Sequence, residues 1–390
     1  MRDVFIVSGA RTPIGKFQGA LAQIPATELG AIVVREAVAR ARIDAARVEE
    51  VFLGNVIGAG LGQAPARHAA LRAGLRAEIS ATQIGKVCGS GMKAAMLASS
   101  ILRAGDAEVL VAGGMENMNR APFLMLDARF GLRAGDHKIV DAAIHDGLWC
   151  AMEDWHMGSA AEFIARECGI TRAMQDEFAF ASHQKALAAI RNCKFKNEIA
   201  PVPLRDGKIF DTDETPRADT SLDALAKLKP AFEENGTVTA GNAPPWSDGA
   251  AALVLVGEEV VARENLQPLA RIVGYAQAGT DPKHVFWAPI YVVRKLMEKI
   301  NWKLSDVDLF EINEAFAAQI LADGNALELD WSRVNVNGGA IALGHPVGAS
   351  GARIIVTLMY ALKDRGLKRG VASLCLGGGE AVAMAVELVK

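Results

Sequence analysis

The hexapeptide Val87-Cys88-Gly89-Ser90-Gly91-Met92 places a cysteine among glycines directly before the apolar run 92–102, which predicts a helix. A thiol at the start of a helix lies where the partial positive charge of the helix N-terminus favours the thiolate. The glycines would let a ligand approach the backbone closely. Because a small buried cysteine in a glycine-rich turn has the same local sequence, the hexapeptide alone favours a nucleophile and a packing residue equally.

The helix start at Ser90 has a counterpart near the C-terminus. Ser90-Gly91-Met92-Lys93 leads on to Gly113-Gly114-Met115-Glu116, and Ser350-Gly351-Ala352-Arg353 leads on to Gly377-Gly378-Gly379-Glu380. Strand-like apolar runs correspond as well, 48–56 to 307–314 and 4–7 to 270–274. Strands alternating with helices in two similar halves predict a duplicated α/β fold.

The sequence pattern changes between the two halves. Residues 119–248 are rich in charged helical stretches and turns. A strand-like apolar pattern returns at 250–256, and this strand would complete the first sheet. We therefore predict an N-terminal half made of residues 1–118 plus 249–268, an inserted loop domain over 119–248, and a C-terminal half over 269–390.

Composition excludes several classes of protein. The 390 residues are 51% hydrophobic, enough for buried sheets in two or three domains. A net charge of −3 without a basic block argues against a nucleic-acid surface. The apolar run at 4–7 is too short for a signal peptide and no later run would span a bilayer, so we expect a cytoplasmic protein without membrane contact. Five cysteines without a CxxC pair predict neither a disulfide framework nor a metal site.

Three further residues are candidates for chemistry. His345 lies in a glycine-rich turn before the second helix start, Cys375 precedes three glycines after an apolar strand, and Asn313 follows another strand. Taken singly, a loop histidine is more often a turn residue, a strand cysteine is more often packing, and the asparagine is equally well a helix cap. Two halves packed face to face would bring His345 and Cys375 close to Cys88, where an imidazole can activate a thiol and a second thiol can move a proton.

Four segments together resemble the active-site signatures of the thiolase family, which makes or cleaves 3-ketoacyl-CoA. They are 87–92, 313–317, 344–351 and 375–379, and the resemblance extends over nearly the whole chain. It implies a layered α/β/α/β/α fold of two duplicated halves with an inserted loop domain that binds coenzyme A. Thioesters of coenzyme A would be substrates, with no tightly bound cofactor and no metal.

The resemblance also implies a role for each matching residue. Cys88 would accept the acyl group, and His345 would activate its thiol. Cys375 would remove a proton from the methyl carbon of the second acetyl-CoA. A water held by Asn313, together with His345, would stabilise the enolate oxygen, and the backbone amides of Cys88 and Gly377 would form a second oxyanion hole.

For coenzyme A itself, the resemblance places Arg217 near the adenine and His156 and Met157 along the pantetheine. The chain departs from the family at Pro244-Pro245-Trp246, where many relatives have a serine, and at Ala224, which replaces a second serine. Hydrogen-bond partners of coenzyme A are lost there, and we expect Trp246 to stack or pack in their place.

A second departure concerns the acyl pocket. The segment Val285-Phe286-Trp287-Ala288-Pro289 replaces a Met-Gly pair common near the acyl group in the family. We expect the bulk of Phe286 or Trp287 to restrict acyl length.

The reaction expected from the resemblance is the condensation of two acetyl-CoA to acetoacetyl-CoA and CoA through S-acetyl-Cys88, with its thiolytic reverse. A broader-chain 3-ketoacyl-CoA thiolase is the nearest alternative and would share every catalytic residue. A ketoacyl or hydroxymethylglutaryl synthase is disfavoured by Cys375, and a non-catalytic CoA-binding or scaffold protein is suggested only by Pro244 and Ala224. A homodimer or homotetramer is expected, with residues 120–146 at the tetramer contact.

Overall fold

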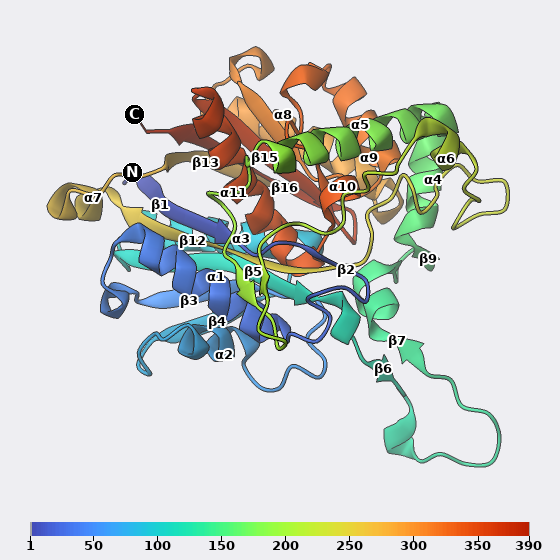
Figure 1. The fold of residues 1–390 in the computed structure, drawn as a ribbon, viewed down its shortest axis with the longest axis horizontal. Helices are drawn as coiled ribbons and strands as arrows, with labels where there is room; N and C mark the ends of the chain where they lie inside the picture. The colour runs from blue at the N-terminus through green and yellow to red at the C-terminus, as the bar shows by residue number, and fades with distance from the viewer. Residues whose placement is uncertain (1, 390) are drawn as a thin grey trace.

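The computed structural model describes residues 2–389, and a ten-stranded mixed sheet runs through it (Figure 1). The order of its strands is β14-β15-β16-β13-β1-β12-β5-β3-β4, with the short β2 on β12. The strands of the N-terminal part are β1 (Val4–Arg11), β2 (Gly15–Lys16), β3 (Glu50–Gly54), β4 (Ser80–Ile84), β5 (Val109–Asn117) and β12 (Ser247–Gly257). Those of the C-terminal part are β13 (Ala270–Gly279), β14 (Leu309–Ile312), β15 (Arg369–Leu376) and β16 (Glu380–Leu388).

The strand order confirms the predicted duplication. From one end the sheet reads β14-β15-β16-β13, and from the other side it reads β3-β5-β12-β1 with β4 added outside. In each set the first two strands are parallel and the other pairs are antiparallel. The two sets join through a short contact between β1 and β13. Strand β12, which follows the long insertion, pairs with β1 and β5 and so completes the first set as expected.

Helices form the remaining layers. Helices α3 (Ser90–Ala104) and α11 (Val347–Arg365) pack on each other between the two strand sets, and share their apolar core with both (Figure 1). Every residue of 347–359 is buried, which is the pattern of a central helix. Two further helices, α1 (Ala26–Ala41) and α2 (Pro65–Arg72), cover the outer face of the N-terminal strands, and α8 (Ala288–Ile300) and α9 (Ala317–Ala326) cover that of the C-terminal strands. The predicted five-layer α/β/α/β/α arrangement is therefore present.

The segment between β5 and β12 holds helices and small hairpins. Its helices α4 (Met157–Glu167) and α5 (Arg172–Arg191) pack against α9 over the C-terminal part of the sheet, whereas Ala200 and Val202 of the same segment pack on the core of the N-terminal part. An arm built on β6 (Phe123–Leu124) and β7 (Val140–Asp141) projects from the molecule (Figure 1). Shorter elements are β8 (Trp149–Cys150), β9 (Trp155–His156), β10 (Val202–Pro203), β11 (Ile209–Phe210), α6 (Leu222–Ala226), α7 (Glu258–Glu264) and α10 (Ala340–Leu343). The exact domain boundaries given above stay a prediction.

Residues 2–389 contain neither a membrane-spanning helix nor a metal-binding cluster. No helix there combines the length and the apolar character needed to cross a membrane. No group of three or more His, Cys, Asp or Glu side chains there is arranged to hold a metal ion.

Candidate active site

One pocket brings together four of the residues singled out from the sequence. Cys88, His345, Cys375 and Gly377 all line it, although they come from sequence positions up to 289 residues apart. Its empty space is about 720 Å³, and its wall is mostly apolar. A concave apolar site with a few convergent polar groups is the usual form of a small-molecule site. Both thiols and the imidazole open into the same space.

Cys88 lies in the 3-10 turn η2 (Val87–Gly89), directly before α3. Burial raises the pKa of its thiol to about 12, although the backbone N–H groups of Gly377 and of Cys88 itself favour the sulfur anion. The expected stabilisation of a thiolate by the helix start is therefore outweighed by desolvation. In the free protein the Cys88 sulfur carries its proton at neutral pH.

The glycines beside Cys88 have a packing role. A Cβ at Gly89 would lie 2.3 Å from Leu376 Cδ2, and one at Gly91 would lie 2.8 Å from the backbone N of Ala352. These glycines let α3 approach β15 and α11 closely. Protein atoms occupy the space on the Cβ side of both glycines, and the close approach of a ligand to the backbone at Cys88 stays a prediction.

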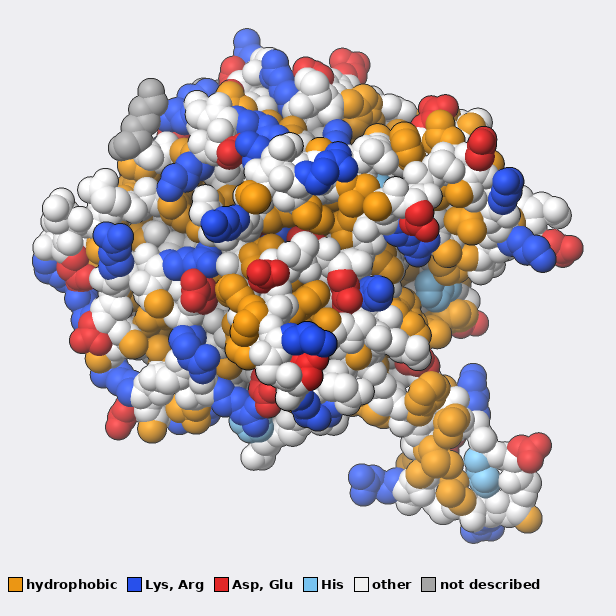
Figure 2. All heavy atoms as spheres, viewed as in Figure 1, with side chains coloured by type: hydrophobic (Ala, Val, Ile, Leu, Met, Phe, Trp, Pro, Cys, Tyr) orange, Lys and Arg blue, Asp and Glu red, His pale blue; other side chains and the backbone are white. Residues whose placement is uncertain are grey.

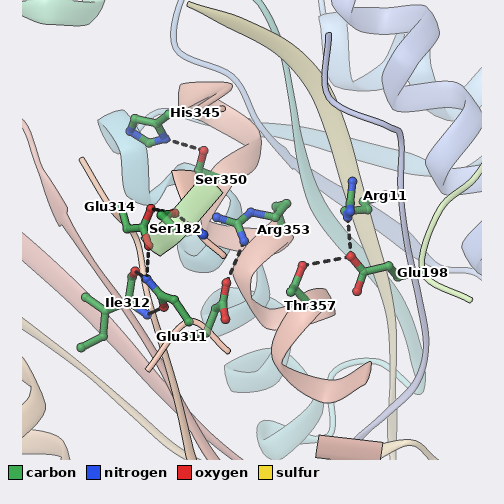
Figure 3. Close-up of polar contacts among 12 residues, drawn as sticks. Arg11, Ser182, Glu198, Glu311, Ile312, Glu314, His345, Ser350, Arg353 and Thr357 are labelled. Atoms are coloured by element: carbon green, nitrogen blue, oxygen red, sulfur yellow. Dashed lines mark hydrogen bonds and ion pairs between the residues drawn. The ribbon is translucent and has the colours of Figure 1, made fainter. Parts of the chain in front are cut away.

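His345 lies in the loop between α10 and α11, and its ring is held in one orientation. Gly344 has φ +102°, which favours glycine, and Ser247 Oγ accepts the His345 backbone N–H at 3.1 Å. Ring atom Nδ1 lies 2.6 Å from Ser350 Oγ (Figure 3), and that hydroxyl donates to the carbonyl of Pro346 at 3.0 Å. Because the hydroxyl proton is used, Nδ1–H donates to Ser350 and the other ring nitrogen, Nε2, keeps its lone pair.

The second ring nitrogen faces the amide of Asn313. Asn313 Nδ2 lies 3.5 Å from His345 Nε2, and no described residue is a hydrogen-bond partner of the buried Asn313 Oδ1. Helix α9 begins after Phe316, so Asn313 is not its cap. Burial, with a smaller contribution from the Arg353 charge, lowers the pKa of His345 to about 3. The imidazole is therefore neutral and has an accepting nitrogen available.

Cys375 is the second-last residue of strand β15 and is only 2% exposed. It packs among apolar residues that include Phe286 and Phe316. Burial raises the pKa of the Cys375 thiol well above its usual value, and the nearby Cys88 and Asp323 would raise it further when charged. The two thiols are thus close neighbours in a poorly solvated site, and a charge on either one disfavours a charge on the other.

A buried carboxyl joins the two halves beneath the pocket. Glu116 accepts the backbone N–H groups of Val56, Ile57 and Gly348 at 3.0, 3.3 and 3.0 Å, and Asn55 Nδ2 at 2.8 Å. Burial raises the pKa of Glu116 to about 7. These bonds join the ends of β3 and β5, in the N-terminal half, to the first turn of α11. They therefore fix the half that contains Cys88 against the helix that follows His345.

Three of the four residues predicted to contact coenzyme A also line this pocket: His156, Met157 and Trp246. The His156 ring caps α4 by accepting the Gly158 N–H at 2.9 Å and stacks on Phe232, with centroids 4.8 Å apart. Trp246 packs edge-to-face on Phe17, with centroids 5.5 Å apart. The pocket wall therefore has an aromatic side chain at Trp246, where the sequence departs from the family pattern.

Arg217, the fourth, does not line the pocket of Cys88. It lines a neighbouring hollow together with Lys16, His183 and Thr215. Ala243 and Pro245 form a wall common to both spaces, so the hollow adjoins the pocket.

The two bulky residues of the 285–289 segment differ in position. Phe286 lines the pocket and packs edge-to-face on Phe316, with ring centroids 5.6 Å apart. Trp287 does not line it and packs between two apolar clusters. Of the two candidates for restricting the pocket, only Phe286 is in place to do so.

Sequence reasoning missed several residues of the site. Phe232 and Phe316 line the pocket, and Ser350 orients the imidazole. Ser350 could have been found, because it stands five residues after His345 across the predicted helix start, within the same glycine-rich motif. Phe316 could have been found likewise, because it lies within the signature segment 313–317, whereas Phe232 lies outside the four segments.

Comparisons with known proteins agree with this geometry. The chain matches the family model for the thiolase N-terminal domain over residues 4–259 and that for the thiolase C-terminal domain over residues 266–388. An acetyl-CoA acetyltransferase of Pseudomonas aeruginosa is 54% identical over 388 residues, 98% of this chain and 99% of the relative. One of Cupriavidus necator is 53% identical over 391 residues, 99% and 100% of the two chains. The crystal structure of the Bacillus anthracis acetyl-CoA acetyltransferase superposes with a TM-score of 0.98 at 45% identity, over 100% of this chain and 99% of that one.

Proposed function

This chain belongs to the thiolase family, and from that premise we propose that it is an acetyl-CoA C-acetyltransferase that condenses two acetyl-CoA into acetoacetyl-CoA and CoA, and runs the thiolytic reverse. The observation that carries the proposal is the single pocket that holds two thiols and an imidazole with an accepting Nε2. Coenzyme A thioesters are the substrates, and no tightly bound cofactor takes part.

In the first half-reaction Cys88 takes the acetyl group. The Cys88 sulfur attacks the thioester carbon while its proton passes to Nε2 of His345, and the oxyanion is stabilised by the backbone N–H groups of Cys88 and Gly377. The bond to the coenzyme A sulfur then breaks, and that sulfur takes the proton of Cys375 and leaves as free CoA. Because both pKa values oppose a preformed thiolate–imidazolium pair, the proton leaves Cys88 as the new carbon–sulfur bond forms.

In the second half-reaction Cys375 acts on a carbon acid. Its thiolate removes a methyl proton from the second acetyl-CoA, and the enolate oxygen is stabilised by the His345 imidazolium and a water held by Asn313. The carbanion attacks the acetyl carbon on Cys88, the carbon–sulfur bond breaks, and the Cys88 sulfur recovers its proton from His345. Both thiols and the imidazole return to their starting forms.

Substrate comparison tests the proposal against its alternatives. The purified protein is given acetyl-CoA alone, and then CoA with acetoacetyl-CoA or with medium- and long-chain 3-ketoacyl-CoA. We expect acetoacetyl-CoA from the first mixture and preferential cleavage of acetoacetyl-CoA in the second. Efficient cleavage of long chains would make it a broader thiolase, and no acetylation of Cys88 on intact-protein mass spectrometry would make it a non-catalytic CoA-binding protein.

Replacing Phe286 by alanine is expected to widen the acyl-chain preference. The ring occupies the pocket wall next to Cys375, and the space of a methylene group in an apolar pocket changes selectivity by about 10-fold or more. We expect kcat/KM for a medium-chain 3-ketoacyl-CoA, relative to acetoacetyl-CoA, to rise at least about 10-fold. Phe163→Ala is the control, because Phe163 packs on Trp155 and His284 without lining the pocket. If Phe286→Ala leaves this ratio of kcat/KM values unchanged, another part of the pocket wall restricts the acyl length.

We further propose that the chain forms a homodimer or homotetramer, with the arm at residues 120–146 as the tetramer contact. Five apolar side chains of the arm are each more than half exposed: Phe123, Leu126, Phe130, Leu132 and Ile139 (Figure 2). A lone monomer rarely exposes such a patch. Strand β4 is also an exposed edge of the sheet, open to pairing with a second copy.

The arm proposal predicts a change of oligomeric state. Replacing residues 126–138 by a short Gly-Ser linker is expected to convert a tetramer into a dimer, as measured by light scattering after size exclusion. A tetramer that survives this replacement would place the contact elsewhere, and a wild-type monomer would refute both assemblies.

A further inference from the structure

A carboxyl group is buried in α9 with no cation beside it. Asp323 is fully buried, its Oδ2 accepts a hydrogen bond from Gln319 Nε2, and its Oδ1 has no partner among the described residues. Burial raises the pKa of Asp323 well above its usual value, because the charged form is poorly solvated there. A buried carboxyl lowers the stability of the fold unless hydrogen bonds compensate for the lost water. The one hydrogen bond that Asp323 makes therefore indicates what the group interacts with.

That partner reaches the loop of the active site. Gln319 is fully buried, and its Oε1 accepts the backbone N–H of Ala315 at 2.9 Å. Ala315 lies two residues after Asn313, and it lines the pocket of Cys88. A continuous path of two hydrogen bonds therefore runs from Asp323 through Gln319 to the turn 313–316.

The carboxyl decides which way the glutamine amide points. The two ends of a side-chain amide have nearly the same shape, so an unrestrained Gln319 could present either its oxygen or its NH₂ group to the Ala315 N–H. Only the oxygen can accept that N–H. An acceptor at Asp323 fixes the NH₂ group on the far side and so keeps the oxygen toward Ala315.

Other bonds hold the opposite end of the same turn. Glu314 accepts from Ser182 Oγ at 2.7 Å (Figure 3), from Asn335 Nδ2 at 2.9 Å and from the Ile341 backbone N–H at 3.1 Å. The Asn313 backbone N–H donates to the Ser373 carbonyl at 3.0 Å. The Gln319 bond completes this set on the side of the turn that lines the pocket.

We propose that Gln319 and Asp323 are a positioning pair, which sets the turn 313–316 so that the Asn313 amide lies against His345 Nε2 and its free Oδ1 can hold a water. This proposal rests on the proposed function, in which that water stabilises the enolate. Neither residue of the pair lines the pocket of Cys88. The pair therefore serves the second half-reaction, in which Asn313 takes part, and not the acetylation of Cys88.

The two half-reactions can be measured separately in the full-length protein. Acetylation of Cys88 by acetyl-CoA is followed by rapid quenching and intact-protein mass spectrometry, and condensation by the steady-state appearance of acetoacetyl-CoA. Asp323→Leu has nearly the same shape but cannot accept the Gln319 bond. We expect acetylation within about twofold of wild type and condensation reduced about 10- to 100-fold, the usual effect of a misplaced group near the chemistry.

Two further variants separate positioning from a loss of stability. Asp323→Asn keeps an oxygen that accepts from Gln319, so both rates are expected within about twofold of wild type. Gln319→Met removes the hydrogen bonds to both Asp323 and Ala315. It is expected to give the same result as Asp323→Leu, with acetylation near the wild-type rate and condensation reduced. The double variant Gln319→Met with Asp323→Leu should be no slower than the slower single variant, because the two residues act through one path.

Distinct outcomes would overturn the proposal. Undiminished condensation in Asp323→Leu or Gln319→Met would show that the pair does not position the turn. Equal losses in acetylation and condensation, together with a lowered Tm, would show a structural role only. Should Asp323→Leu fail to fold, Gln319→Met decides between these outcomes. Failure of the wild-type protein to acetylate Cys88 would refute the proposed function itself and is seen before any variant is compared.

Discussion

Cys88→Ala is expected to lower turnover by at least about 10⁴-fold in both directions, because the variant has no sulfur to carry the acetyl group between the two half-reactions. The remaining groups cannot take its place. Cys375 lies near the end of β15 inside an apolar cluster, and His345 is held by Ser350 through Nδ1 and faces Asn313 through Nε2. Direct transfer between two coenzyme A thioesters would require both in one pocket at reacting distance.

Mass spectrometry and kinetics check this result together. Wild type mixed with acetyl-CoA should gain the mass of one acetyl group on the peptide that contains Cys88, and Cys88→Ala should gain none. The matched control is Cys193→Ala, since Cys193 is an exposed cysteine outside this pocket. Acetoacetyl-CoA formed by Cys88→Ala within about 10-fold of the wild-type rate would rule out the acyl-enzyme route.

The duplicated fold could be predicted because each half repeats a local pattern that only one architecture satisfies. The serine and glycine at 90–91 and at 350–351 both lie near the start of a central helix, α3 or α11. Each helix is followed by a strand with glycines, which lie inside β5 at 113–114 and directly after β15 at 377–379. Once two copies are recognised, their equivalent ends must meet near a common axis. That step alone brought Cys88, His345 and Cys375 into one pocket, as the structure confirms.

The properties that depend on long-range packing could not be predicted in this way. The helix start at Ser90 suggested a thiolate at Cys88, but the sign of the effect depends on how much protein covers the sulfur, and burial raises its pKa to about 12. The spacing of Phe286 and Trp287 could not show which ring lines the pocket. Asp323 looked like an ordinary helix residue, because neither its burial nor its bond to Gln319 has a local signature.

Cys375→Ala is expected to separate the two half-reactions. The variant lacks the assigned base, and the residues packed around position 375, such as Phe286 and Phe316, are apolar and cannot replace it. Loss of a positioned base costs about 10²- to 10⁴-fold. We expect condensation to fall by about 10³-fold or more, while acetylation of Cys88 falls no more than about 10-fold, because the coenzyme A thiolate is a good leaving group that can take a proton from water.

Exchange of the acetyl methyl protons with deuterated solvent measures the assigned step directly, since it requires the enolate but no carbon–carbon bond. It should be fast in wild type and lost in Cys375→Ala. Cys375→Ser sharpens the test: its hydroxyl is close in size to the thiol but is a much weaker acid, so it should not restore exchange even where it restores packing. Exchange at the wild-type rate in Cys375→Ala would assign the base to another group, and His345, whose Nε2 is unprotonated in this structure, would be the next to replace.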